Sequence, residues 1–159
     1  MAGNMKAVKL RIKSVQSTMQ ITKAMELVAS SKLRKAKERA ETCRPYFTEL
    51  HETLKDIARE NIDFSSVYAR ESSNPRYCYV AIAGDRGLAG GYNANLFKCL
   101  EAAAEGKDYV VLPIGKKAVE YFRQRGIECL TDKFAEIADI SVADCFEIAN
   151  LLCEEFRKG

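Results

Sequence analysis

Apolar residues recur at alternating spacings of four and three along the first third of the chain. The series runs from Val8 to Ile57, and polar residues interrupt it only at Thr22 and Glu26. A repeat of 3.5 residues keeps one stripe of a helix turned towards a neighbouring helix while the two supercoil. The members of this stripe, called the seam below, are Val8, Ile12, Val15, Met19, Thr22, Glu26, Ala29, Leu33, Ala36, Ala40, Cys43, Phe47, Leu50, Leu54 and Ile57.

The seam predicts one helix from about Met5 to Arg59, with no glycine inside it. At 1.5 Å per residue, about fifty residues make a rod of roughly 75 Å. Pro45 removes one hydrogen bond and clashes with the carbonyl of Glu41, so we expect a kink there. The alternative is two helices with a break at Arg44. We assign residues 1–60 to a long coiled-coil helix, and no second seam that could pair with it follows in the chain.

Residues 61–76 are polar and show no period, which predicts a linker or surface loop. From residue 77 onwards, short apolar runs alternate with amphipathic segments. The expected strands are 77–83, 109–114 and a weak third one at 127–130. The expected helices are one that begins at Asn93 and stops at Gly106, one over 116–125, and a last one that begins at Ser141. This alternation is typical of βαβ units, so we predict a small α/β, Rossmann-like domain over 77–159 with a parallel, three-layer sheet. Three short strands make a small sheet, and a further strand would complete it.

Two of these helices have expected N-caps, Asn93 and Ser141. The last helix is expected to bury one apolar face. That face consists of Val142, Cys145, Phe146, Ala149, Leu152, Cys153 and Phe156.

The charge of the chain is unevenly distributed. Residues 1–40 carry ten basic and two acidic side chains, a net charge of +8, whereas the other 119 residues carry 15 basic and 20 acidic ones. Such a cationic helix favours a polyanion or an acidic protein surface as its partner. A DNA-binding coiled coil is one option, and it predicts retention on DNA that falls with salt. A protein partner is favoured over nucleic acid, because basic and seam residues overlap and no base-reading Asn follows Asn4 in the helix.

The six cysteines form no C-x-x-C pair and the chain has one histidine, His51, so no metal or cofactor site is expected. Most cysteines occupy apolar positions, which predicts buried free thiols in a reducing cytoplasm. No run approaches the roughly 20 apolar residues of a membrane span, so direct insertion into a membrane is not expected.

The segment GDRGLAGGYN, residues 84–93, follows an expected strand and precedes an expected helix. Dinucleotides and phosphates bind at such places in doubly wound folds. However, the segment has neither the lysine-bearing P-loop pattern nor G-x-G-x-x-G spacing. An exposed loop for protein contact suits the glycines equally well. A small nucleotide-binding α/β protein with a helical oligomerisation arm therefore stays open as an alternative, although no catalytic set of side chains is visible.

Two long motifs resemble one family. Residues 11–15 (RIKSV) with 21–34 (ITKAMELVASSKLR), and then the loop at 84–93, closely resemble the gamma subunits of rotary proton-translocating ATP synthases. The resemblance covers essentially the whole chain, which looks like the N-terminal portion of such a subunit. Ala89 stands where the family often has Cys, a small residue in either case.

The resemblance implies a central stalk, or rotor, that couples proton flow to ATP synthesis and performs no chemistry itself. In that family the N-terminal helix forms an antiparallel coiled coil with a C-terminal helix, which this chain lacks. The pair stands inside a hexamer of alpha and beta catalytic subunits, and an α/β domain lies near the epsilon subunit and the membrane c-ring. This implies a peripheral protein at the cytoplasmic face of the bacterial plasma membrane.

The same motifs imply partner-binding residues. Shaft contact with acidic loops of the beta subunits is carried over to Lys23, Met25, Lys32 and Arg34. Contact with the foot of the stalk or with the stator is carried over to Arg86 and its loop. The resemblance implies no catalytic, metal-binding or cofactor-binding residue.

Overall fold

The computed structural model describes residues 2–60, 67–69, 76–137 and 140–158. The chain divides into two compact units, residues 1–64 and 65–159. The first unit is helical, and the second mixes helices with a small parallel sheet. The predicted linker 61–76 lies mostly outside the described residues.

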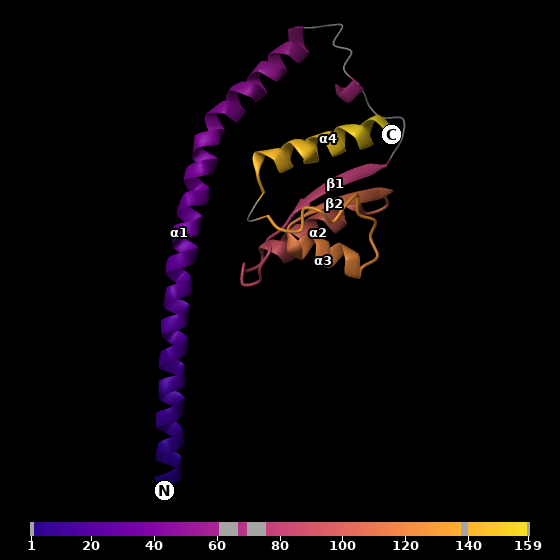
Figure 1. Cartoon of the computed structure of the whole chain (residues 1–159). Helices are drawn as coiled ribbons and strands as arrows, with labels where there is room; N and C mark the ends of the chain where they lie inside the picture. The colour runs from indigo at the N-terminus through magenta and orange to yellow at the C-terminus, as the bar shows by residue number, and fades with distance from the viewer. Residues whose placement is uncertain (1, 61–66, 70–75, 138–139, 159) are drawn as a thin grey trace. The chain divides into compact units, whose positions relative to one another are not determined.

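A single helix, α1 (Ala2–Glu60), makes up the described part of the first unit. It confirms the predicted long helix and passes through Pro45 without ending, so the alternative of two helices is wrong. Figure 1 shows the helix bending in its last third, which contains Pro45. The bend has a local cause, because Pro45 cannot donate to the carbonyl one turn back.

The sheet of the second unit has two strands among the described residues. Strand β1 (Tyr77–Ile82) pairs in parallel with β2 (Tyr109–Ile114), in a register that places Val80 opposite Leu112. The predicted third strand at 127–130 is reduced to one parallel bridge between Val111 and Cys129. The segment is too short for more, because Gly126 turns the chain at its start with a φ of 65°. A three-stranded sheet is therefore not formed by these residues.

Helices α2 (Tyr92–Ala104) and α3 (Lys116–Gln124) pack on one face of the sheet. Phe97 of α2 and Phe122 of α3 meet edge to face, with ring centroids 5.7 Å apart. They cover Ala81 of β1 and Val111 of β2, both of which are fully buried. This cluster is the larger of the two apolar cores in the described residues.

Helix α4 (Val142–Lys158) packs on the other face of the sheet (Figure 1). Ile148, Leu151 and Leu152 lie against Leu112 and Ile114 of β2. The predicted buried face of this helix is only partly correct. Leu152 makes the contact, but Val142 is 73% and Phe146 is 68% exposed. The sequence shows a wide apolar arc on α4, and the sheet covers only one side of it.

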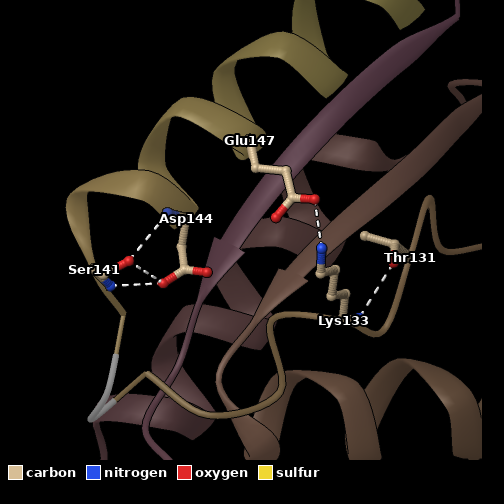
Figure 2. Close-up of polar contacts among 5 residues, drawn as sticks. All are labelled: Thr131, Lys133, Ser141, Asp144 and Glu147. Carbon is tan, nitrogen blue, oxygen red and sulfur yellow. Dashed lines mark hydrogen bonds and ion pairs between the residues drawn. The ribbon is translucent and has the colours of Figure 1, made fainter.

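The start of α4 is fixed by a reciprocal cap, as predicted for Ser141 (Figure 2). The Ser141 backbone N–H and hydroxyl both donate to Oδ2 of Asp144, at 2.7 and 2.6 Å, and the Asp144 N–H donates back to the Ser141 hydroxyl. These hydrogen bonds hold the pKa of Asp144 below its usual value. An ion pair between Lys133 and Glu147 ties the preceding loop to the next turn of the helix.

The six cysteines are free thiols, but the prediction that most are buried is wrong. Cys129 and Cys153 are partly exposed, and the other four, Cys43, Cys78, Cys99 and Cys145, are exposed. They do sit at apolar positions of helices and strands. The apolar pattern, however, does not say which apolar positions are covered by other parts of the same chain.

Candidate partner-binding surfaces

The seam is an exposed apolar stripe. Every described side chain of α1 is solvent-exposed, and Val15, Leu33 and Phe47 are 62, 70 and 66% exposed. Isolated exposed apolar residues are common, but a long contiguous apolar stripe marks a binding site. Its coiled-coil spacing indicates that the partner is another helix.

The first polar interruption of the seam is satisfied within α1. The Thr22 hydroxyl donates to the carbonyl of Met19 at 2.9 Å and lies 3.2 Å from that of Thr18. A hydroxyl that donates to a carbonyl of its own helix leaves no unsatisfied hydrogen-bond donor in an apolar interface. Thr22 therefore does not prevent the seam from packing against an apolar helix.

The shaft residues implied by the resemblance flank the seam. Neighbours two positions apart on an α-helix are turned by about 200°, so Lys23 and Met25 project to opposite sides, as do Lys32 and Arg34. The stretch from Lys23 to Arg34 spans about 16 Å at 1.5 Å per residue. All four side chains are exposed, and Met25 is 55% exposed. The structure thus places them on one short, accessible section of α1.

The positive charge of this section is only weakly compensated. Arg34 pairs with Glu38 at 3.4 Å and Lys37 with Glu41 at 3.7 Å, and all of these side chains are at least 60% exposed. Exposed pairs of this kind are worth little in water. In the described part of the chain, neither Lys23 nor Lys32 has an ion pair. The cations are therefore available to an acidic partner.

The loop between β1 and α2 displays Arg86 and Leu88. Both side chains are exposed, and Leu88 is 98% exposed with a φ of 63°. Few non-glycine residues adopt a positive φ, and those that do are held by their surroundings. Here the Tyr92 hydroxyl donates to the carbonyl of Ile82 at 2.8 Å, at the root of the loop. The loop is thus anchored at its base while its tip faces solvent.

Asp85 anchors the same loop, a role that sequence reasoning missed. One carboxylate oxygen accepts from the Lys116 N–H at 3.2 Å, and both accept from the Ile137 N–H at 3.0 Å. The carboxylate therefore occupies the start of α3, where a phosphate would otherwise find a backbone donor. The available signal was an acidic residue two positions after the expected strand 77–83, because such a position can reach the start of the next helix.

Asn93 also plays a different part from the predicted one. The residue before α2 is Gly91, without a side-chain cap, and Asn93 lies inside the first turn. Its side-chain oxygen accepts from the Gly84 N–H at 3.0 Å across the loop. The prediction of Asn93 as N-cap is wrong because this longer-range hydrogen bond closes the glycine loop instead.

A close backbone crossing supports the loop from below. Gly115 precedes α3 with a φ of 93°, and a Cβ at this position would lie 2.1 Å from the Ala83 carbonyl oxygen. Only glycine permits both that φ and that approach. The Ala83 N–H donates to Ile114 and the Gly115 N–H to Phe134, each at 2.9 Å. The first bond holds the ends of β1 and β2 together under the loop, and the second ties the end of β2 to Phe134.

Among the described residues, no group of His, Cys, Asp and Glu side chains could bind a metal ion. In the same part of the chain, no helix combines the length and the apolar character needed to cross a membrane. The features that stand out are an exposed seam, flanking cations and an anchored loop, all of which suit contact with other polypeptides.

Comparison with known proteins gives one consistent result. The family model described as ATP synthase matches residues 4–159. The chain is 50% identical to the ATP synthase gamma chain of Ruminococcus albus, with 99% of this chain and 56% of the relative covered. It is 42% identical to the gamma chain of Alkaliphilus metalliredigens, covering 99% and 55%. It is 38% identical to a gamma chain of Acetobacterium woodii named as sodium ion specific, covering 100% and 53%. The chain thus spans about half the length of these curated relatives.

Proposed function

Because this chain belongs to the ATP synthase gamma chain family, we propose that it serves as the shaft portion of a central stalk and works mechanically. Rotation of an asymmetric shaft inside a ring of catalytic subunits forces otherwise equivalent sites into different conformations. Ion flow drives the turning during ATP synthesis, and ATP hydrolysis drives it in reverse. The observation that carries the proposal is α1 itself, whose whole seam is exposed and flanked by cations that are at most weakly compensated.

A shaft that bears torque must be stiff, and a two-stranded coiled coil is stiffer than one helix. The seam carries Ala29, Ala36 and Ala40 around Leu33, which is 70% exposed. Small residues let the backbone of a partner helix approach closely. Leu33 provides a large side chain that can insert between residues of that helix, as in coiled-coil packing. The proposed partner is the C-terminal helix that the family pairs with this one, running antiparallel to it.

The remaining partners follow from charge and exposure. Lys23, Met25, Lys32 and Arg34 are proposed to contact acidic loops of the beta subunits within the alpha/beta hexamer. Arg86 and its loop are proposed to contact the foot of the assembly, where the epsilon subunit and the c-ring lie. Opposite charges across such interfaces guide encounter and fix orientation more than they add affinity.

We propose that the α/β unit is part of a Rossmann-like, three-layer domain in the whole subunit. Support comes from helices on both faces of a parallel sheet. The proposed location is the cytoplasmic face of the bacterial plasma membrane, as a peripheral part of the synthase. That the coupled ion is a proton stays a prediction, since one relative is named as sodium ion specific.

Charge reversal on α1 tests the shaft contact. The variant carries Lys32→Glu, Arg34→Glu and Lys35→Glu in a gamma chain completed with the remaining part of the Ruminococcus albus relative and reconstituted with its synthase. ATP synthesis should fall on the order of tenfold, if each lost contact is worth about 0.5 kcal/mol. ATP hydrolysis should fall less, because slippage spares hydrolysis more than synthesis.

The matched control reverses three exposed lysines of the second unit, Lys98, Lys107 and Lys158, and so makes the same change in net charge. It should retain most of the synthesis rate. Equal synthesis by the α1 variant and the unmodified complex would contradict the assigned contact. Equal losses in both variants would indicate a general charge effect and not a contact at Lys32 and Arg34.

A further inference from the structure

Leu88, at the tip of the loop between β1 and α2, is the most exposed large apolar side chain in the described part of the chain. Its exposed fraction is 98%, and the next highest value is 73%, at Leu27, Tyr46 and Val142. A single exposed leucine needs no explanation by itself. Leu88 does need one, because its backbone conformation is also unfavourable for a leucine.

Among the described residues other than glycine, Leu88 alone has a positive φ, of 63°. The Cβ of an L-residue is crowded against the backbone in this region, so glycine and asparagine are the residues that usually adopt it. The loop uses glycine on both sides of Leu88, at Gly87 and at Gly90, and the φ of Gly90 is 58°. A glycine at position 88 would remove the strain. The leucine therefore makes the loop less stable than a glycine would at the same position.

Packing within the described chain does not offset this strain. The leucine side chain is almost fully exposed, and a Cβ added at Gly87 or at Gly90 would meet no described atom within 4 Å. Figure 1 shows the loop projecting beyond the end of β1. Both the strained backbone and the exposed apolar surface are unfavourable in the chain alone, and a partner that buries Leu88 would offset them.

The base of the loop holds its tip in one position. The Gly84 N–H donates to the side-chain oxygen of Asn93 at 3.0 Å, and the Gly84 carbonyl accepts from the Lys117 N–H at 3.0 Å. The Tyr92 hydroxyl adds its hydrogen bond to β1 at 2.8 Å. A loop fixed in this way presents Leu88 in one orientation, which reduces the conformational entropy that is lost when a partner binds.

The charge beside Leu88 is positive. Residues 84–93 contain two charged side chains, Asp85 and Arg86. The Asp85 carboxylate is turned inward, where it accepts backbone N–H groups from two later segments of the chain. Arg86 is exposed, and within the described ranges it takes part in no ion pair. The tip thus offers an apolar group and a cation, so the complementary surface is an apolar recess bordered by carboxylates.

We propose that Leu88 is the anchor of a protein contact, and that it inserts into an apolar recess of another synthase subunit whose rim carries Asp or Glu side chains. The proposal rests on the proposed function, because it adds an apolar anchor to the contact assigned to Arg86 and its loop. Arg86 guides the encounter through its charge. Leu88 supplies most of the affinity of this contact, because buried anchors dominate interface energies and rim charges contribute little.

Unfolding of the chain alone tests whether Leu88 serves the fold instead. Leu88→Asn removes the apolar group and places there a residue that tolerates a positive φ, whereas Leu88→Met keeps an apolar side chain. In urea, the Leu88→Asn chain should unfold at the same concentration as the parent or at a higher one. A lower midpoint would show that the leucine stabilises the fold, and the proposal would then be wrong.

Competitive assembly tests the contact itself. Each variant is completed with the remaining part of the Ruminococcus albus gamma chain and mixed with an equal amount of the completed parent. The mixture equilibrates with limiting alpha, beta and epsilon subunits of that species, and mass spectrometry gives the ratio of the two chains in the assembled complex. Leu88→Asn should be under-represented by about tenfold or more, as expected for loss of a buried leucine side chain, and Leu88→Met by less than about threefold. Equal incorporation of Leu88→Asn and the parent would overturn the proposal.

Salt separates the anchor from the charge beside it. Arg86→Gln should reduce incorporation at low salt and have little effect at high salt, because ions screen an exposed charge. The loss caused by Leu88→Asn should persist at high salt, because apolar burial is not screened. A Leu88→Asn defect that disappears at high salt would contradict an apolar anchor.

The charge-reversal variant of α1, included in the same competition, distinguishes failure of the anchor from failure of the shaft contact. Exclusion of the α1 variant with normal incorporation of Leu88→Asn would remove the anchor and leave the shaft contact in place. Exclusion of Leu88→Asn with normal incorporation of the α1 variant would do the reverse.

Two other occupants of the loop tip are tested with the 159-residue chain alone. A dimer in sedimentation that Leu88→Asn abolishes would assign the anchor to a second copy of the chain. Binding to phosphatidylglycerol vesicles that Leu88→Asn abolishes would assign it to a lipid surface. Either result would refute insertion into another subunit, and neither is expected.

Discussion

Replacement of Gly115 by alanine should cost the second unit a large part of its stability. The new Cβ would lie 2.1 Å from the oxygen and 2.9 Å from the carbon of the Ala83 carbonyl, and both are backbone atoms that cannot turn aside. A separation of more than 3 Å requires the ends of β1 and β2 to move apart by about 1 Å.

The magnitude follows from the contacts at that crossing. A φ of 93° costs an L-residue about 1–2 kcal/mol. Separation of the strand ends breaks the hydrogen bonds from Ala83 to Ile114 and from Lys117 to Gly84, each worth about 1 kcal/mol. The total loss is about 3–4 kcal/mol, against the roughly 5–15 kcal/mol that holds a typical domain together.

The assay is urea unfolding followed by near-ultraviolet circular dichroism of the tyrosines, since the chain has no tryptophan. With a slope of about 1 kcal/mol per molar urea, the midpoint should fall by about 3 M. The matched control is Gly87→Ala, because a Cβ there meets nothing within 4 Å and its φ is not in the left-handed range. It should change the free energy of unfolding by less than about 0.5 kcal/mol. The reasoning is refuted if the two variants unfold at the same urea concentration.

Three further predictions concern other parts of the chain. Pro45→Ala restores a donor inside α1 and should stabilise the helix by about 3 kcal/mol, seen as a higher melting temperature at 222 nm; an unchanged melt would show that the bend has another cause. Because hydrogen bonds from Ser141 lower the pKa of Asp144, the contribution of that carboxylate is complete above its usual value of 3.8 and is lost as pH falls through the lowered one. The melting temperatures of the parent and Asp144→Asn should therefore differ at neutral pH and converge in acid, and a gap that persists in acid would argue against the cap. The isolated chain should either dimerise through its seam or fray along α1, so a monomeric chain with a fully ordered helix in sedimentation and hydrogen exchange would contradict the exposed seam as a binding site.

Long-range regularity made α1 predictable from the sequence. Fifteen positions at one spacing define the seam, and their agreement outweighs the single conflicting signal from Pro45. The strands that begin at Tyr77 and Tyr109 were equally predictable, because short apolar runs between glycine and polar segments are typical of β-strands. The predicted start of α3 at Lys116 was also confirmed.

Tertiary contacts decided the points that failed. Asn93 has the chemistry of an N-cap, but its oxygen bonds Gly84 nine residues away. Phe146 has the chemistry of a core residue, but the sheet beneath α4 is too narrow to reach it. Asp85 went unassigned because Lys116 and Ile137, whose N–H groups donate to it, are far along the chain. The local sequence pattern identifies groups that need a hydrogen-bond or packing partner. Only the fold determines which partner each group has.

The self-contained hydrogen bonding of Thr22 bears on how freely gamma chains of different origin can be recombined. A partner helix can place leucine, alanine or valine opposite that threonine, because the hydroxyl is already bonded to Met19 and needs no matching group. Glu26, four residues on, has no ion pair in the described chain, so a basic residue of the partner helix opposite it would form a favourable ion pair. Hybrid stalks built from two species should therefore tolerate a change in the partner residue opposite Thr22. Their stability should depend more on whether the partner residue opposite Glu26 is basic.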